Sequence, residues 1–265
     1  MTKYIRKWSP EGEKKGCVIV IHGLGEHSGR YNNFANYLNG RGFQVYAMDL
    51  PGHGDDEGKR GHVKQFEEFF QTCGKMSRTA KMENPKLPLF LFGHSLGGLI
   101  ALRYLERNED PYNASAVSAP ALQNFKEQLG ILFYLVKPLV YIMPWATMGN
   151  RIDPGDLSSN PEAVERYKED PRVHDRISLK LFSEMNRNIN EAWNQIANVK
   201  TPLLLLCGEE DRVVSTRAIN EFYDKLPIKD KKIVSFVEGK HELFEDKRNQ
   251  DAFFKEIADF FSAHL

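Results

Sequence analysis

The pentapeptide Gly93-His94-Ser95-Leu96-Gly97 constrains this chain more than any other feature. An apolar run over 87–92 precedes it, and a helical pattern from Leu99 to Leu105 follows it. A strand that turns sharply into a helix holds one serine hydroxyl above the sheet, in a strained and accessible geometry. Glycines two residues before and after the serine suit this turn, because a Cβ there would collide with the backbone or the helix. Gly-x-Ser-x-Gly also occurs by chance in glycine-rich turns, but this context predicts that Ser95 is a nucleophile.

The balance of charge gives no reason to expect a nucleic acid as partner. The chain has 265 residues, with 36 Lys and Arg against 36 Asp and Glu, so its formal net charge is zero. Binding to a polyanion is favoured by an excess of positive charge. A hydrophobic content of 41% and a charged content of 27% are typical of a globular protein with a sizeable core.

The cysteines and the start of the chain suggest a cytoplasmic protein. The three cysteines, Cys17, Cys73 and Cys207, have neither the number nor the spacing of a disulfide framework or a metal motif. Cys17 and Cys207 lie in apolar runs, so we expect both to be buried. No basic and then apolar signal segment opens the chain. The longest apolar stretch, Leu129–Trp145, is too short and too interrupted by charge and proline to cross a membrane.

Strand and helix patterns alternate along most of the chain. Continuous apolar or alternating runs predict strands at Lys3–Trp8, Cys17–Ile21, Gly42–Met48, Leu87–Phe92, Ala114–Ser118, Pro202–Cys207 and Lys232–Val237. Helical spacing predicts helices at Tyr31–Asn39, Val63–Glu83, Gly97–Arg107, Ser215–Leu226 and Asn249–His264. Repeated β-α units of this kind predict an α/β fold, with a mostly parallel sheet and helices on both faces.

The alternation stops between about residues 120 and 198, where the sequence contains no convincing strand. We expect 1–119 and 199–265 to form the core, and 120–198 to form a helical cap over the carboxyl ends of the strands. Sites of open α/β sheets lie at those ends. The apolar segment Leu129–Met143 either lines a tunnel, touches a bilayer surface or packs as the core of the cap, and the sequence leaves these alternatives open.

A serine hydroxyl needs a base to take its proton and an acid to orient that base. In folds with this kind of turn, the acid and then the histidine follow the serine along the chain. The histidines after Ser95 are His174, His241 and His264. His174 lies in the interrupted segment and His264 is the penultimate residue, whereas His241 follows a predicted strand through a short loop. We therefore expect His241 to be the base.

The acid is expected in the loop that follows the predicted strand 202–207. Asp211 lies four residues beyond that strand, in a loop that Val213 and Val214 can pack down. Glu209 and Glu210 compete for the role, and all three acids could instead only solvate a turn. We favour Asp211 because its place in the loop lets it turn back towards the carboxyl ends of the strands.

The glycine-rich loop 22–31 follows the predicted strand 17–21. Backbone amides of such a loop can stabilise the negative charge that develops on a carbonyl oxygen during acyl transfer. The N–H groups of Leu24 and Leu96 are the natural pair of oxyanion donors. The alternative, a phosphate-binding loop, lacks both Gly-Lys-Ser/Thr and G-x-G-x-x-G. His53 is expected to be structural, and the sequence requires neither a metal nor a cofactor.

These residues resemble the monoglyceride lipase and lysophospholipase-like branch of the α/β-hydrolase superfamily. The segments that carry the resemblance are residues 22–31, Gly61-His62, Ser159–Pro161, Asp170-Pro171, Val173–Ile177 and His241–Phe244. The resemblance implies a triad of Ser95, Asp211 and His241, with Leu24 and Leu96 as oxyanion donors. It further implies that residues 120–198 form a mobile, lipophilic cap.

The same resemblance implies a set of residues around the glycerol end of a monoacylglycerol. Glu26 and Arg30 would order the entrance loop or the glycerol pocket, and His94 and Tyr167 would lie near the glycerol. Only the resemblance points to glycerol.

The sequence departs from the family pattern at three positions. Asp56 replaces a usual serine and can cap the same turn, so catalysis is expected to be intact. Val214 stands where some relatives carry a cysteine, so thiol-directed inhibition is not expected there. Phe244 cannot provide a polar contact to glycerol.

Together these features predict a serine carboxylester hydrolase that cleaves monoacylglycerol to glycerol and a fatty acid through an acyl-enzyme. The alternatives are a lysophospholipase, a broader carboxylesterase or thioesterase, and an inactive hydrolase-fold protein that only binds ligands. The expected partner is a lipid ester, with transient contact between the cap and a membrane surface. The sequence does not define the acyl chain length or the oligomeric state.

Overall fold

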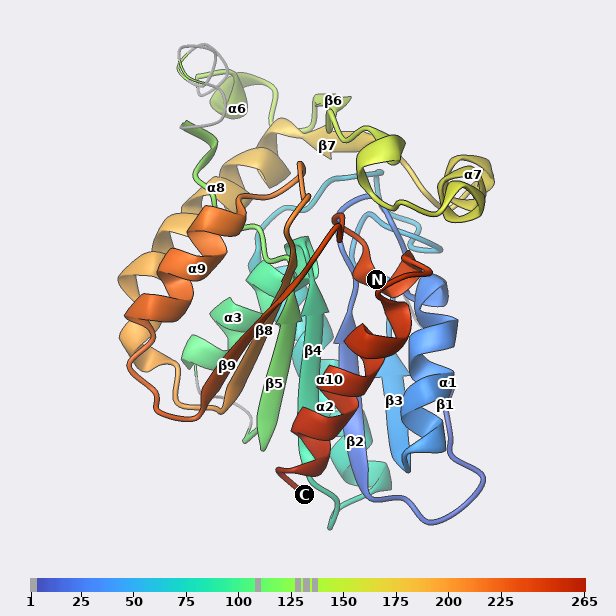
Figure 1. Cartoon of the computed structure of the whole chain (residues 1–265). Helices are drawn as coiled ribbons and strands as arrows, with labels where there is room; N and C mark the ends of the chain where they lie inside the picture. The colour runs from blue at the N-terminus through green and yellow to red at the C-terminus, as the bar shows by residue number, and fades with distance from the viewer. Residues whose placement is uncertain (1–3, 108–110, 127–129, 131–133, 135–137) are drawn as a thin grey trace.

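A seven-stranded sheet forms the centre of the computed structural model, which describes residues 4–107, 111–126, 130, 134 and 138–265 (Figure 1). The strands are Arg6–Trp8 (β1), Gly16–Ile21 (β2), Phe43–Ala47 (β3), Leu89–His94 (β4), Ala114–Ser118 (β5), Leu203–Gly208 (β8) and Lys231–Phe236 (β9). Their order in the sheet is β1-β3-β2-β4-β5-β8-β9. Strand β1 is antiparallel to β3, and all other neighbours are parallel. The predicted mostly parallel sheet is confirmed.

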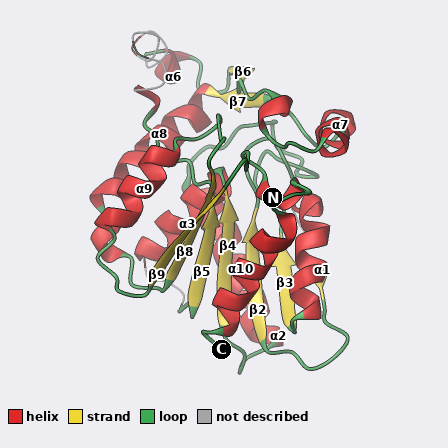
Figure 2. Cartoon of the chain, in the orientation of Figure 1, coloured by secondary structure: helices red, strands yellow, loops and turns green. Residues whose placement is uncertain are grey.

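The central strands are apolar throughout because helices cover both faces of the sheet (Figure 2). In β2, Cys17, Ile19 and Ile21 enter one hydrophobic core, whereas Val18 and Val20 enter the other. The first core includes side chains of Glu67–Glu83 (α2), Leu96–Arg107 (α3), Leu179–Asn194 (α8) and Thr216–Lys225 (α9). The second includes side chains of Asn32–Gly40 (α1) and Gln250–Ser262 (α10).

Helix α2 begins at Glu67, four residues later than the sequence predicts. The Glu68 carboxylate accepts hydrogen bonds from the backbone N–H groups of Lys64, at 2.7 Å, and Gln65, at 3.0 Å. These bonds satisfy amides just before the helix and stabilise a non-helical approach. Residues 51–64 therefore belong to a loop that joins β3 to α2.

The expectation that residues 120–198 contain no strand is wrong. Thr147–Gly149 (β6) and Arg176–Ser178 (β7) form an antiparallel pair, with Thr147 opposite Ser178. Runs of three residues are too short to show the alternation that marks a strand in sequence. This pair and Pro161–Glu169 (α7) lie above the carboxyl ends of the main sheet (Figure 1). Helix α8 belongs to the predicted cap, but it packs against α3 of the predicted core. The boundaries of a separate cap therefore remain a prediction.

Part of the apolar segment Leu129–Met143, namely 129, 131–133 and 135–137, lies outside the described residues. The short helix Leu139–Ile142 (α6) is described, and none of its residues is buried. Tyr141 is 83% exposed and Ile142 is 67% exposed. The described part of this segment is therefore not a core of the cap. Within the described residues, every helix is too short or too polar to cross a bilayer.

Candidate active site

Ser95 occupies a tight turn between β4 and α3. Its φ angle is 55°, in the left-handed region that non-glycine residues rarely adopt. A Cβ at Gly93 would overlap the carbonyl oxygen of Gly97, and one at Gly97 would overlap that of Ile21. The predicted need for glycine at both positions is confirmed. The side chain sits in a strained turn, which holds a hydroxyl at the end of a buried strand.

The sheet brings three more loops to the same edge. Ile21 pairs with Gly93 in adjacent parallel strands, so the loop after β2 lies beside Ser95. A Cβ at Gly23 would lie 3.2 Å from the Cβ of Ser95. Strands β8 and β9 also end together, and Asp211 and His241 lie in the loops that follow them. Parallel strands thus deliver residues far apart in sequence to one place.

The acid and the histidine favoured from the sequence are in contact. Asp211 Oδ2 and His241 Nδ1 are 2.8 Å apart, and their side chains are 0% and 3% exposed. The other carboxylate oxygen, Oδ1, accepts hydrogen bonds from the N–H groups of Val213 at 2.8 Å and Val214 at 3.0 Å. Burial acts to lower the pKa of His241, but the carboxylates of Asp211, Glu242 and Glu26 together raise that pKa above the ordinary value, with Asp211 contributing most among them.

The competing residues lie elsewhere. Glu209 and Glu210 are exposed. His174 donates through Nε2 to the carbonyl of Gly52, and His264 contacts Asp230 near the opposite edge of the sheet. These contacts leave His241 as the histidine of the site.

The two N–H groups expected to bind an oxyanion belong to the residue after Ser95 and to the loop after β2. Leu96 is the first residue of α3, so its N–H has no acceptor within the helix. Leu24 lies in the loop after β2 and lines the same cavity as Ser95. Neither N–H donates a hydrogen bond to another described residue. Likewise, no hydrogen bond joins the Ser95 hydroxyl to His241 in the described residues, and such bonds often tighten only when substrate binds.

A cavity of about 620 Å³ opens at Ser95. Its apolar lining comprises Leu24, Ala121, Phe125, Met148, Ile152, Ile177, Phe182, Met185, Val213 and Val214. Its polar lining includes Gln123, Asn150, Arg151, Asp153, Asp156, Arg212 and Ser215. The described residues contain no cluster of His, Cys, Asp and Glu arranged to hold a metal. The site can therefore hold an apolar chain next to a serine hydroxyl.

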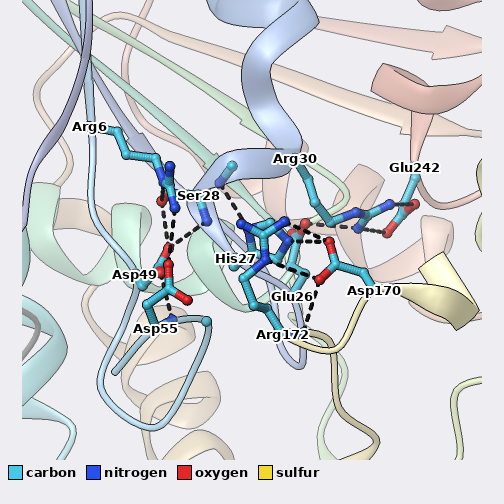
Figure 3. Close-up of polar contacts among 12 residues, drawn as sticks. Arg6, Glu26, His27, Ser28, Arg30, Asp49, Asp55, Asp170, Arg172 and Glu242 are labelled. Atoms are coloured by element: carbon cyan, nitrogen blue, oxygen red, sulfur yellow. Dashed lines mark hydrogen bonds and ion pairs between the residues drawn. The ribbon is translucent and has the colours of Figure 1, made fainter. Parts of the chain in front are cut away.

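Glu26 and Arg30 form a buried ionic network with Glu242 (Figure 3), and neither of the two lines the cavity. The Nη1 and Nη2 atoms of Arg30 each donate a hydrogen bond to the Glu242 carboxylate, at 2.6 Å. Nη1 also donates to the Glu26 carboxylate, at 2.9 Å. Glu26 accepts hydrogen bonds from the N–H of Gly23 at 2.5 Å and from the hydroxyl of Tyr31 at 2.8 Å. The network thus ties the loop that carries Leu24 to the residue after His241. Sequence reasoning missed Glu242, although its place beside His241 was a usable signal.

His94 and Tyr167 do not line the cavity either. The His94 ring is 1% exposed and lies 4.8 Å from the His241 ring. The Arg30 guanidinium lies 4.9 Å from the Tyr167 ring centre. His94 therefore packs against the histidine of the site, and Tyr167 packs against the buried ionic network.

Two further contacts fix the loop after β2 (Figure 3). Asp170 follows α7, and its Oδ2 atom lies 2.9 Å from Nε2 of His27. Asp170 also accepts a hydrogen bond from Arg172. The Ser28 N–H donates to Asp49 at 2.9 Å.

The turn at Asp56 forms as expected, because its carboxylate accepts from the N–H groups of Gly52 and Gly58, at 2.8 and 3.0 Å. Cys17 and Cys207 are each 1% exposed, as predicted.

The fold and this site define an α/β-hydrolase. A family model described as serine aminopeptidase, S33, matches residues 12–248. The chain therefore belongs to this family, within the monoglyceride lipase and lysophospholipase-like α/β-hydrolases, and is a serine hydrolase.

Three relatives illustrate the match. A monoacylglycerol lipase of Paleococcus ferrophilus, known from a crystal structure, is 39% identical, with a TM-score of 0.90 over 99% of both chains. Monoglyceride lipase of Mus musculus is 30% identical over 92% of this chain and 80% of its own length. An uncharacterized abhydrolase domain-containing protein of Dictyostelium discoideum is 33% identical over 85% of this chain, which spans only 24% of that protein.

Proposed function

We propose that this protein hydrolyses monoacylglycerol to glycerol and a fatty acid. The observation that carries the proposal is the strained Ser95, which lines a largely apolar cavity and lies at the same end of the sheet as a buried Asp211–His241 pair. The names of the mouse and Paleococcus relatives support glycerol esters as the substrates.

In the proposed acylation step, Ser95 Oγ attacks the ester carbonyl while His241 Nε2 takes its proton. Asp211 holds the Nδ1–H of His241, so the imidazole keeps the tautomer in which Nε2 is a base. The N–H groups of Leu24 and Leu96 stabilise the charge on the carbonyl oxygen. The imidazolium then protonates the leaving glycerol oxygen, and the acyl group stays on Ser95.

The deacylation step uses the same residues with water in place of glycerol. His241 takes a proton from water, the hydroxide attacks the acyl carbonyl, and the fatty acid leaves as Ser95 recovers its proton. Asp211 stabilises the imidazolium in both steps, which agrees with its effect on the pKa of His241. The acyl chain lies along the apolar lining during this step, next to Leu24, Phe182 and Val214.

A comparison of substrates tests the proposal. We expect kcat/KM for a long-chain 1-monoacylglycerol to exceed kcat/KM for the matching lysophosphatidylcholine and acyl-CoA by about 10-fold or more, since only the first has a small neutral leaving group. Initial rates of fatty acid release, measured across acyl lengths, check this. Negligible monoacylglycerol turnover beside strong turnover of another ester would contradict it.

We also propose that the segment around α6 touches a membrane surface when the enzyme draws its substrate. Its exposed apolar side chains are Tyr134, Leu139, Tyr141, Ile142, Met143 and Trp145. Such a patch is unusual on a soluble surface, and tyrosine and tryptophan favour the headgroup region of a bilayer.

Two charged substitutions in this patch test the contact. We expect Tyr141→Glu with Ile142→Glu to reduce sedimentation with phosphatidylcholine vesicles and hydrolysis of vesicle-borne monoacylglycerol by about 5-fold or more, because each glutamate must stay in water. Hydrolysis of a short soluble ester should not change. The matched control is Met82→Glu with Val237→Glu, two side chains of similar exposure, 83% and 68%, outside the patch. Equal loss in both variants would contradict the proposal.

A further inference from the structure

A second cavity, of about 610 Å³, shares no lining residue with the cavity at Ser95. It lies between helix α2 and the loop 51–64. Met48, Pro51 and Val63 give it an apolar part. Its basic side chains are Lys59, Lys64, Lys75 and Arg78, and we call it the basic cavity.

The four cations are not neutralised by ion pairs. All four residues are exposed, and none forms an ion pair or a side-chain hydrogen bond with another described residue. The other acids of α2 are used elsewhere, because Glu67 pairs with Arg107 and Glu83 with Lys7.

Two carboxylates line the basic cavity, and both are bound to the backbone. Glu68 accepts hydrogen bonds from the N–H groups of Lys64 and Gln65, at 2.7 and 3.0 Å. Asp56 accepts from those of Gly52 and Gly58. Four positive charges therefore face two negative ones, in a chain whose formal net charge is zero.

The surplus charge acts on His62, which also lines the cavity. Burial lowers the pKa of His62, and the positive charges of Lys59, Lys180 and Lys64 lower it further, against the opposing effect of Glu68. His62 Nδ1 lies 2.9 Å from the hydroxyl of Ser178. A neutral histidine leaves the charge of the cavity to the lysines and the arginine.

We propose that the basic cavity binds a small phosphate-bearing anion with an attached organic group, such as a nucleoside diphosphate. Arginine binds phosphate oxygens in a two-pronged fashion, and lysines add point charges that need no fixed geometry. The volume suits a ligand of this size, and the apolar side chains can contact its organic part. A lone phosphate would leave most of the cavity empty.

Isothermal titration calorimetry at about 0.1 M salt tests the proposal, because this ionic strength screens loose surface attraction. The probes are ADP, inorganic pyrophosphate and adenosine. We expect ADP to bind one site with a Kd below about 1 mM, pyrophosphate to bind more weakly and adenosine not to bind measurably. Absence of saturable ADP binding, or equal binding of adenosine, overturns the proposal.

Two double variants locate the binding. We expect Lys75→Gln with Arg78→Gln to weaken ADP binding by about 10-fold or more, because the variant loses two positive charges that would contact the phosphate groups. The matched control is Lys86→Gln with Lys229→Gln, which removes two exposed lysines outside the cavity at the same cost in net charge. Thermal unfolding confirms that each variant is folded. Unchanged affinity in the first variant, or equal loss in the control, overturns the assignment.

Discussion

Replacement of Ser95 by alanine is expected to lower kcat for ester hydrolysis by about 10⁴- to 10⁶-fold. The variant loses the atom that attacks the carbonyl, while the Asp211–His241 pair and the apolar cavity stay in place. Initial rates on monoacylglycerol and on a short p-nitrophenyl ester measure the loss. The midpoint of thermal unfolding should not fall, since the substitution removes no apolar packing contact and deletes only one hydroxyl from a strained turn.

Two further variants make this result specific. Ser95→Ala combined with His241→Ala should be no slower than either single variant, because residues that act as a unit do not contribute additively. Ser262→Ala, near the end of α10, removes a hydroxyl outside the site and should keep full activity. A Ser95→Ala enzyme that keeps a tenth of its activity would contradict the assignment of the nucleophile.

Arg30→Met is expected to reduce the free energy of unfolding by about 3–5 kcal/mol. Arg30, Glu26 and Glu242 have side chains that are 8%, 3% and 5% exposed, so removal of the guanidinium leaves two carboxylates buried without their cation. Methionine fills a similar volume, so the loss reports the charge more than a cavity. Urea unfolding followed by circular dichroism measures the change.

A surface pair provides the control for this substitution. Arg248 pairs with Glu238, and their side chains are 66% and 58% exposed. Exposed pairs contribute about 0–1 kcal/mol, so Arg248→Met should have little effect. Similar free energies of unfolding for the two variants would contradict the expected contribution of the buried network to stability.

Much of the fold follows from local pattern. The apolar runs at 17–21, 87–92 and 202–207 predict buried parallel strands because helices on both faces leave no polar side to the sheet. The places of Ser95, Asp211 and His241 can also be predicted from local pattern, since each residue follows shortly after a strand. Parallel strands then place all three at one edge.

Other features depend on contacts between distant segments. Strands β6 and β7 are three residues each, and they pair across a long intervening segment that contains α7. Glu242 reads as a polar residue in a loop until the fold places it against Arg30. The basic cavity likewise depends on the loop 51–64 and helix α2 coming together, although its lysines are visible in the sequence.

Ser95 is expected to form the covalent acyl intermediate. A fluorophosphonate probe reacts with an activated serine and stays attached, so peptide mass spectrometry can locate it. We expect a single labelled peptide that contains Ser95, no label in Ser95→Ala and strongly reduced label in His241→Ala. A label on another residue, or undiminished labelling of Ser95→Ala, would contradict it.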